Sequence, residues 1–355
     1  GFEVQLVASE PQVLDPVAFD WGADGKLWIA EMGDYPLGID GRGKSGGVVR
    51  WLEDADGNEH YEKSTVFLEG LNFPTGVMAW DKGILVSAAP DIIYAEDTNG
   101  NGRADVRRVL FTGFSEGNQQ HRVNGFARGL DNWIYCANGD SGGTIRSTKT
   151  GQSVNIGGRD FRIQPDTGRI DAQAGQTQFG RRRDDWGNWF GCNNSNPMWH
   201  YVLGDHYVRR NPHTRAPDPR VHVSVTPGAA PVFPISRTLV RFNDPAGINR
   251  FTSACSPIVY RDQYLTQLVR NALVCEPVHN LIHREVMEPA GASFTSRRLA
   301  SEQDSEFLTS SDNWFRPTMI RTGPDGALWV ADMYRLVIEH PEWIPQAWQD
   351  RLDLR

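Results

Sequence analysis

The apolar residues of this chain fall in short runs that turn residues join in pairs. The segments "DPVAFDWGADGKLWIAEM" (15–32) and "FRPTMIRTGPDGALWVADM" (315–333) show the pattern most clearly. Each holds an apolar stretch, an Asp-Gly turn, a second apolar stretch and an acidic residue. Asp-Gly between two apolar runs is a strong hairpin signal, so an antiparallel hairpin is predicted near each end of the chain.

Four weaker copies of the pattern occupy 73–90, 121–140, 183–194 and 255–277. The six predicted turns fall near Gly25, Gly83, Asn132, Gly187, Arg270 and Gly326. Short strands repeated at intervals of roughly 50 residues are typical of propeller blades, whereas a solenoid would have shorter and more uniform repeats. The pattern therefore predicts an all-β fold, a six-bladed β-propeller.

We expect the propeller to occupy residues 1–340 as a single domain. An insertion is expected at about 200–250, where the segment 213–234 is rich in proline. Residues 341–355 change in character and predict a tail with a short helix that leads to a further domain.

In an antiparallel hairpin, the start of the first strand and the end of the second lie at the same end. In a propeller these positions would meet at one mouth of the central channel. The residues before the first strands are Asp15, Thr75, His121, Arg181, Ser256 and Arg316. The residues after the second strands are Glu31, Ala89, Asn138, Asn193, Glu276 and Asp332. The chemically varied residues are thus predicted to gather on one face.

Composition and charge narrow the possible functions. The 36 Gly and 21 Pro residues are spread along 355 positions, which favours short strands and turns over long helices. The net charge of −8 and the pI near 5.6 argue against a non-specific nucleic-acid partner. No apolar run approaches the roughly 20 residues of a membrane span, and no CxxCH motif for c-type haem is present.

Two of the four cysteines, Cys255 and Cys275, each stand one residue before a mouth position of the same hairpin. Neighbouring strand ends can come within disulfide distance. The sequence therefore allows either a disulfide, which would indicate an oxidising compartment, or free buried thiols.

The predicted mouth residues suggest three kinds of chemistry. His121 could accept a proton near neutral pH, and Asp140, at the end of the same hairpin, would orient its imidazole. Arg316 could hold a carboxylate. Four further residues offer oxygens that suit a hard cation such as Ca²⁺; they are Glu31, Asn138, Asn193 and Asp332. The set fits a metal-assisted hydrolysis, an oxidation by an anionic cofactor, or a polar rim without activity that binds a protein or a carbohydrate.

The segment "DTNGNGRAD" (97–105) places four oxygen-bearing residues and one glycine in the order of an EF-hand-like loop. The four are Asp97, Asn99, Asn101 and Asp105. The closing glutamate of such a loop is replaced by Arg108. A structural Ca²⁺ loop is predicted here, with a plain turn rich in Asx residues as the alternative. In the related segment 53–62, Glu59 stands where glycine belongs, and we expect a turn.

Three consecutive arginines, Arg181, Arg182 and Arg183, precede the fourth hairpin. They form either a solvated loop or a cationic wall for a cofactor or substrate. Trp189 and Trp314 belong either to the core between blades or to the wall of a sugar or quinone site.

The segment "HRVNGFARGLDNWIYCANGD" (121–140) resembles the corresponding part of soluble PQQ-dependent glucose and sorbosone dehydrogenases. "NWFRPTMIRTGPDGALWVADM" (313–333) is similar to their last blade. Nearly the whole chain resembles the N-terminal propeller of planctomycete and verrucomicrobial "membrane-bound dehydrogenase" proteins. The phrases that carry this resemblance are "LNFPTGV", "NQQHRVNG", "DDWGNWFGCNNSNPMWHYVL" and "DNWFRP".

The resemblance implies a six-bladed propeller that holds pyrroloquinoline quinone (PQQ) and Ca²⁺ at its mouth. His121 would take the proton of a substrate hydroxyl, Arg316 would hold a PQQ carboxylate, and Asn194 would lie near the calcium. The implied substrate is a sugar or another alcohol. A cytochrome c is a candidate electron acceptor, and the implied location is periplasmic or otherwise extracytoplasmic.

The chain departs from the soluble glucose dehydrogenases at two places. Their Arg-Asn pair before the fourth blade falls near Gln176 and Thr177 here, and the neighbouring Arg181, Arg182 and Arg183 are the candidate substitutes. Their lysine in the fifth blade has no counterpart except His279 nearby. Six-bladed lactonases of the gluconolactonase and paraoxonase type, which hold Ca²⁺ at the mouth, are the alternative resemblance.

Overall fold

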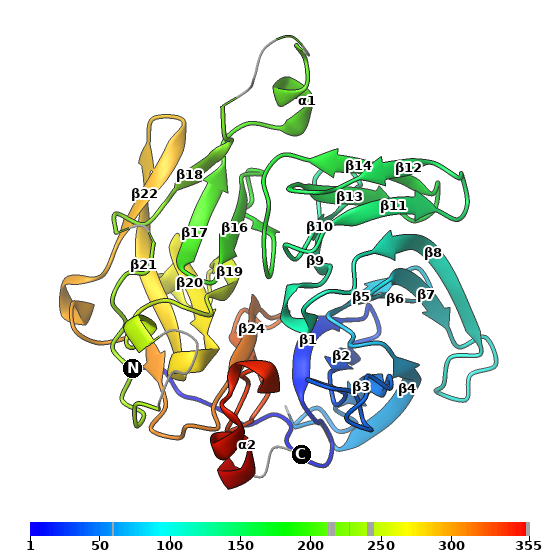
Figure 1. The fold of residues 1–355 in the computed structure, drawn as a ribbon, viewed down its shortest axis with the longest axis horizontal. Helices are drawn as coiled ribbons and strands as arrows, with labels where there is room; N and C mark the ends of the chain where they lie inside the picture. Colours follow the sequence, from blue (N-terminus) through cyan, green and yellow to red (C-terminus); the bar gives the residue numbers. More distant parts are fainter. Residues whose placement is uncertain (59, 212, 214–216, 227, 240–244, 353–355) are drawn as a thin grey trace.

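Six antiparallel sheets surround one central axis in the computed structural model (Figure 1). The structure describes residues 1–58, 60–211, 213, 217–226, 228–239 and 245–352. Each of the six predicted hairpins is present, and its first strand is the innermost strand of a sheet. The prediction of an all-β, six-bladed propeller is confirmed.

Blades 1 and 3 are four-stranded sheets, and blade 2 is a six-stranded sheet. Blade 1 contains β1 (Pro16–Trp21), β2 (Leu27–Glu31), β3 (Gly47–Glu53) and β4 (Lys63–Leu71). Blade 2 contains β5 (Gly76–Trp80), β6 (Gly83–Ala88), β7 (Asp91–Glu96) and β8 (Val106–Phe114), extended at its outer edge by β11 (Gly143–Ser147) and β12 (Ser153–Asn155). Blade 3 contains β9 (Asn124–Arg128), β10 (Ile134–Ala137), β13 (Asp160–Gln164) and β14 (Arg169–Gln173).

The last three blades differ in size. Blade 4 contains β15 (Arg182–Arg183), β16 (Trp189–Asn193), β17 (Asn196–Tyr201) and β18 (Arg220–His222). Blade 5 contains β19 (Cys255–Val259), β20 (Asn271–Glu276), β21 (Leu281–Ala290), β22 (Ser293–Arg297) and β23 (Leu308–Thr309). Blade 6 contains β24 (Pro317–Thr322) and β25 (Leu328–Asp332).

The helices are short and lie outside the blades. The α-helices are α1 (Asp205–Val208) and α2 (Gln346–Leu352). The 3-10 helices are η1 (Gln119–His121), η2 (Pro245–Gly247), η3 (Thr266–Leu268), η4 (Pro277–His279), η5 (Ala300–Glu302) and η6 (Pro341–Trp343). In the described part of the chain, every helix is too short or too polar to cross a membrane.

The innermost strands contact one another in a closed ring that runs β1, β5, β9, β15, β19, β24 and back to β1. Gly125 and Gly180 allow neighbouring innermost segments to approach each other closely. A Cβ on Gly125 would lie 3.0 Å from the Arg181 nitrogen, and one on Gly180 would lie 2.8 Å from the Ser256 Cα. Both glycines have positive φ (+74° and +82°), which other residues rarely adopt. Blades 3, 4 and 5 therefore meet at the channel through glycine.

The predicted turns are found with one difference. Gly25, Asn132, Gly187, Arg270 and Gly326 all have positive φ and lie between the two strands of their hairpins. In blade 2 the residue with positive φ is Asp81 (+51°), and Gly83 begins β6.

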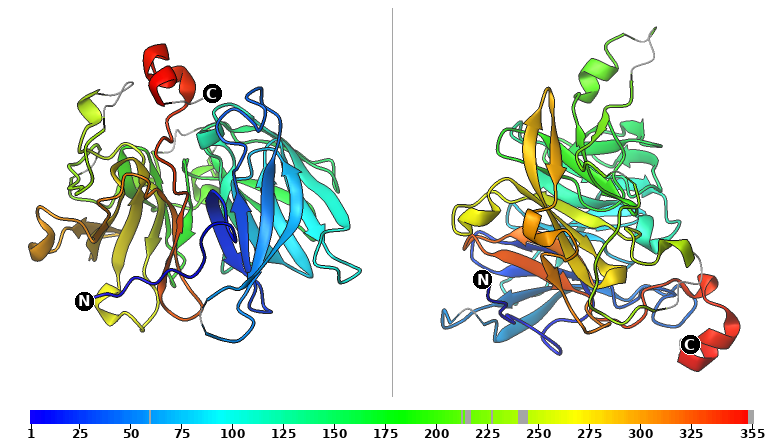
Figure 2. Two further views of the ribbon diagram at one scale, coloured as in Figure 1. Left: turned by 90° about the horizontal axis from the view of Figure 1, so that it is seen from below. Right: turned by 90° about the vertical axis from the view of Figure 1, so that its left-hand side faces the viewer.

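The region predicted as an insertion contains α1, β18 and η2, and β18 pairs with β17 as the outer strand of blade 4. Residues 212, 214–216, 227 and 240–244 of this region lie outside the described residues. The C-terminal tail forms η6 and α2 and stands away from the blades (Figure 2). Residues 353–355 also lie outside the described part.

The two cysteines considered for a disulfide face each other across β19 and β20, but all four cysteines are free and buried. The Cys255 thiol lies 3.6 Å from the backbone oxygen of Thr318 in the neighbouring blade. Of the two alternatives, the structure contains the free buried thiols.

A buried ion pair joins blades 3 and 4. Asp160 accepts hydrogen bonds from Arg181 Nη1 (2.5 Å), from the hydroxyl and backbone N–H of Thr177 (2.6 and 2.9 Å), and from the Asn138 N–H (3.0 Å). The side chains of Arg181 and Asp160 are 3% and 0% exposed. Burial raises the pKa of Asp160, and these four donors oppose that effect. The pair therefore fixes how the two blades pack.

We expect Asp160→Asn to lower the free energy of unfolding by about 3–5 kcal/mol, because it leaves the Arg181 charge buried without its partner. Chemical denaturation of the variant and the wild type measures the difference. The matched control is Asp166→Asn in an exposed turn, which should change the free energy by less than about 0.5 kcal/mol. Equal stability of the two variants would contradict the prediction.

Candidate active site

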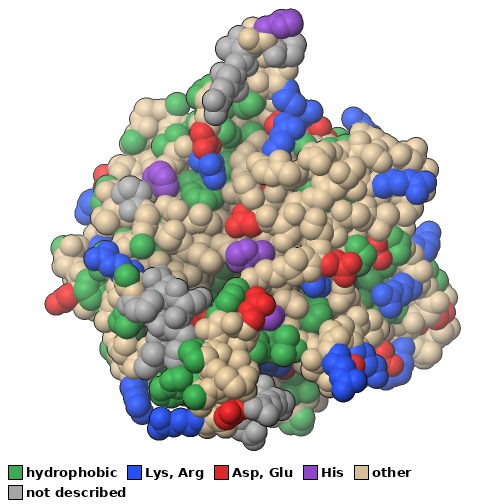
Figure 3. Space-filling view, in the orientation of Figure 1, with side chains coloured by type: hydrophobic (Ala, Val, Ile, Leu, Met, Phe, Trp, Pro, Cys, Tyr) green, Lys and Arg blue, Asp and Glu red, His purple; other side chains and the backbone are tan. Residues whose placement is uncertain are grey.

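A cavity of about 410 Å³ lies at the mouth of the central channel, and all six blades contribute to its wall. The hairpin geometry expected from the sequence is thus observed. The polar lining residues are Tyr35, Thr75, Asn118, Gln119, Gln120, His121, Gln178, Asn194, Thr252, Ser253, Arg316, Thr318 and Glu339. Figure 3 shows this face with a central hollow, histidine near it and most visible Lys and Arg side chains toward the rim.

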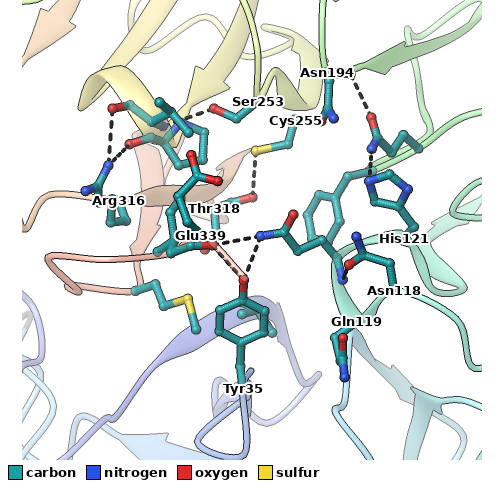
Figure 4. A pocket seen from close by; sticks show the side chains of 18 of the residues that line it. Tyr35, Asn118, Gln119, His121, Asn194, Ser253, Cys255, Arg316, Thr318 and Glu339 are labelled. Atoms are coloured by element: carbon teal, nitrogen blue, oxygen red, sulfur yellow. Dashed lines mark hydrogen bonds between the residues drawn. The ribbon is translucent and has the colours of Figure 1, made fainter. Parts of the chain in front are cut away.

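His121 ends η1, and its half-buried imidazole lines the cavity (Figure 4). The Asn118 side chain caps this short helix by accepting a hydrogen bond from the Gln120 N–H at 2.9 Å. The cap fixes the backbone immediately before β9 and therefore the position from which the ring enters the cavity.

The Gln178 side chain fixes the tautomer of the ring. Its Oε1 accepts a hydrogen bond from the Asn194 N–H at 2.7 Å, so its Nε2 is the atom that lies 2.6 Å from His121 Nε2. An amide nitrogen can only donate. His121 Nε2 is therefore the acceptor, and the neutral ring carries its proton on Nδ1.

Burial lowers the pKa of His121, and the negative charge of Asp140 opposes this effect. The ring is therefore neutral at neutral pH, which is the form that a general base needs. Asp140 follows Gly139 in a turn with φ of +68° and is exposed. Among the described residues, Gln178 alone hydrogen-bonds to the imidazole. The orienting partner is thus Gln178, and the expectation that Asp140 orients the ring is corrected.

Arg316 lies at the mouth, as predicted, and its side chain is 3% exposed. Its guanidinium donates to the backbone oxygens of Arg335 (2.8 Å), Pro277 (2.9 Å) and Val278 (3.2 Å), and also to that of Leu336. These bonds tie the end of blade 5 to the chain that follows blade 6. The residue therefore supports the wall of the cavity as well as facing it.

The other four residues predicted to bind a cofactor lie in four different places. Asn194 lines the main cavity, and its backbone holds Gln178. His279 lines a neighbouring cavity of about 200 Å³, where Nδ1 donates to Glu276 (3.0 Å) and Nε2 accepts from the Asn249 N–H (3.0 Å). Trp314 is 45% exposed and lines neither cavity. Arg181 is buried on Asp160, so the expectation that it lies at the mouth is wrong.

The four residues predicted to form an oxygen cage for Ca²⁺ do not line the cavity. Glu31 accepts from the Leu14 N–H and Arg50 Nε. Asn138 donates to the Ile156 oxygen. Asn193 accepts from the backbone and side chain of Asn196, and Asp332 accepts from the Arg316 N–H. Each side chain supports its own strand end, so these residues do not converge as the sequence suggested.

The loop at 97–105 connects the third and fourth strands of blade 2, and the loop at 54–62 connects those of blade 1. The two loops share a hydrogen-bond pattern. Asp97 Oδ1 accepts from the Gly100 N–H as Asp54 Oδ1 accepts from the Gly57 N–H (2.8 and 2.7 Å). The closing carboxylates also correspond: Asp105 accepts from the Thr98 N–H and Glu62 from the Ala55 N–H. In the described residues, Asp54, Asp56 and Glu62 bring their oxygens within 4.8 Å of one another.

The sequence did not predict the roles of three residues in the cavity: Gln178, Tyr35 and Gln120. Gln178 precedes the arginine triplet by three positions, on the mouth side of the strand. Tyr35 donates to the Ile338 oxygen (2.6 Å), and Gln120 donates to both Tyr35 (2.7 Å) and that oxygen (2.9 Å). Ile338 follows the last blade, so the segment after β25 forms part of the wall. The strand-end rule could have indicated Gln178, but nothing local indicated the pairing with Ile338.

The protein-family model described as "Domain of unknown function (DUF7133)" matches residues 1–355. The chain belongs to this family. No curated protein sequence matches this chain.

Several solved structures share the fold. An oxidoreductase described as a glucose dehydrogenase from Thermus thermophilus is 14% identical, with 96% of each chain covered and a TM-score of 0.55. The PQQ-bound aldose sugar dehydrogenase from Streptomyces coelicolor is 13% identical. The alignment covers 92% of this chain and 90% of the dehydrogenase, with a TM-score of 0.51. The soluble aldose sugar dehydrogenase from Escherichia coli, in its apo form, is 13% identical. The alignment covers 90% of this chain and 93% of the dehydrogenase, with a TM-score of 0.50.

We expect His121 to titrate below the ordinary value of 6.5 and to carry its proton on Nδ1 when neutral, because burial disfavours the cation and Gln178 occupies Nε2. Nitrogen NMR of protein labelled at histidine reports both properties, and His121→Gln assigns the signal.

Gln178→Glu should reverse both properties, since a carboxylate can only accept from Nε2–H and favours the imidazolium. Gln119→Glu, which adds the same charge at another mouth residue, should leave the Nδ1–H tautomer. A wild-type ring protonated on Nε2 would contradict the assignment.

Proposed function

We propose that this protein oxidises a hydroxyl group of a sugar or another small alcohol at the channel mouth, with PQQ as the hydride acceptor. One observation carries the proposal: a neutral imidazole with a lowered pKa faces a cavity of about 410 Å³. The rest of the polar wall consists mainly of amides and hydroxyls, which suit a polyhydroxylated ligand. The volume is in the range of small-molecule sites, roughly 300–1,000 Å³.

The chain's own groups would act as follows. Nε2 of His121 is the atom that can take the hydroxyl proton, and the Gln178 N–H occupies it until a substrate enters. A substrate hydroxyl must therefore displace this N–H before its proton can be transferred. The displaced amide remains anchored through Oε1 to the Asn194 N–H, so it stays close to the reacting oxygen.

The mouth fits PQQ in size and in its polar and apolar lining, and less well in charge. Among the described lining residues, Arg316 is the single arginine or lysine facing this tricarboxylate, and its guanidinium also donates to backbone oxygens. Arg316 and Asn194 would hold the cofactor, and apolar wall would come from residues such as Phe179 and Trp343. When bound, PQQ would supply the acceptor for the hydride, which carries the two electrons of the oxidation. The fold shared with a PQQ-bound aldose sugar dehydrogenase supports the choice of cofactor.

A hydrolase of the lactonase type is supported less well. Such a site needs carboxylate and amide oxygens that converge on one cation. The residues predicted for this role, among them Glu31 and Asp332, are engaged at separate strand ends. A cytochrome c as electron acceptor and an extracytoplasmic location remain part of the proposal.

Replacing His121 by Gln should lower turnover by about 10²–10⁴, the usual contribution of a general base. The test reconstitutes the protein with PQQ and Ca²⁺ and measures dye reduction over a panel of sugars and alcohols. The wild-type rate should rise with pH as the imidazole loses its proton. Because burial lowers this pKa, the midpoint should lie below 6.5, and the variant should lack that limb.

The control is His222→Gln on the exposed outer strand of blade 4, which should keep full turnover. Lactone hydrolysis in place of dye reduction would favour the hydrolase. Retention of sugar without turnover would favour a binding protein. Wild-type turnover in His121→Gln would remove the proposed base.

We further expect the loop at 97–105 to bind Ca²⁺, because Asp97, Asn99, Asn101 and Asp105 follow the spacing of an EF-hand-like loop. A cation that binds only the folded state raises the melting temperature, and EDTA should reverse the rise. The double variant Asp97→Asn with Asp105→Asn should lose this response. Asp54→Asn with Glu62→Gln tests the corresponding loop of blade 1. If the first pair keeps the full response and the second loses it, the calcium loop has been placed in the wrong blade.

A further inference from the structure

The far end of the central channel holds a second cleft, of about 450 Å³. The innermost strands run from the mouth to this end, and their final residues line the cleft from all six blades. Five arginines and three aspartates are among these residues. Five positive charges against three negative charges leave the cleft with an excess of two positive charges, in a protein whose net charge is −8.

Arg182 is a cation of this cleft whose charge has no ion-pair partner among the described residues. It donates through Nη1 to the Phe126 oxygen at 2.5 Å, whereas its Nε is buried without a hydrogen-bond partner. Among the described residues, no carboxylate forms an ion pair with Arg182. Its pKa is lowered to about 9, first because burial removes water from the guanidinium and second because Arg321 carries the same charge.

The neighbouring arginines divide into paired and unpaired groups. Arg321 is paired with Asp20 at 2.6 Å, and Arg261 is paired with Asp185. Arg183 donates to the backbone oxygens of Arg128 and Asp184, both at 2.8 Å. Its pKa is lowered by burial and by the charge of Arg261. Asp20 and Asp185 therefore pair with Arg321 and Arg261. Among the described residues, Arg182 and Arg183 are left without an ion-pair partner in the cleft, where Asp262 is the remaining carboxylate.

We propose that this cleft is a binding site for a small oxyanion group of the phosphate or sulfate class, held by the guanidinium groups of Arg182 and Arg183. A buried charge is costly unless a counter-charge accompanies it. Guanidinium groups bind such oxyanions through paired, charge-assisted hydrogen bonds. The cleft lies at the opposite end of the channel from His121, so the site is separate from the proposed dehydrogenase centre and does not depend on it.

The test measures the melting temperature of the full chain against increasing inorganic phosphate, inorganic sulfate, malonate and sodium chloride at matched ionic strength. A bound anion at free concentration c stabilises the folded state by RT ln(1 + c/Kd), so above Kd the effect grows with the logarithm of the anion concentration. We expect such a rise with phosphate and sulfate that chloride does not produce. Malonate distinguishes a site for tetrahedral dianions from one that accepts any dianion.

Arg182→Gln and, separately, Arg183→Gln should weaken the apparent phosphate affinity by about tenfold or more, because each removes charge-assisted hydrogen bonds. Arg183 is partly exposed, so its variant serves if Arg182→Gln folds poorly. The matched control is Arg107→Gln on the exposed surface of β8, which removes the same charge and should keep the wild-type affinity. An equal rise with chloride, or an equal phosphate response in all three variants, would overturn the proposal.

Discussion

Closure of the ring between the first and last hairpins is the contact on which both ends of the channel depend. Blade 6 contributes two strands, so side chains carry much of this junction. The Thr318 hydroxyl donates to the Pro16 oxygen (3.0 Å), Arg321 pairs with Asp20 (2.6 Å), and Arg335 pairs with Asp15 (2.5 Å). Because β24 passes along the channel, this junction places Arg316 at the mouth and Arg321 at the far cleft.

The two ends of the channel differ in chemistry because every innermost strand runs in the same direction. The residues before these strands supply the mouth with amides, hydroxyls, one imidazole and the Arg316 guanidinium. The last residues of the strands supply the far cleft with arginines. The arginine triplet shows the change within three positions: Arg181 is buried between blades, while Arg182 and Arg183 face the cleft. One short strand thus separates the mouth, lined mainly by amides and hydroxyls, from the cationic cleft.

Buried polar groups at the mouth are satisfied largely by backbone atoms. Arg316 donates to four carbonyl oxygens, and Gln178 is anchored by the Asn194 N–H. Backbone partners are fixed by the fold and do not titrate, so they hold the cavity wall in one arrangement. His121 is the ionisable group of this wall whose pKa burial lowers, which concentrates pH dependence on the residue proposed to act as the base.

The sequence by itself determined the hairpins, their number and the face on which their ends meet. These features depend on local interactions: the Asp-Gly and Asn turns, and the apolar stretches on either side of them. It also placed His121 and Arg316 at the mouth, because strand ends follow from strand positions. Only the tertiary structure decided that Asp160 removes Arg181 from the mouth and that Gln178, not Asp140, holds the imidazole. Burial and hydrogen-bond pairing depend on segments distant in the chain, and strand periodicity carries no information about which distant partner a side chain meets.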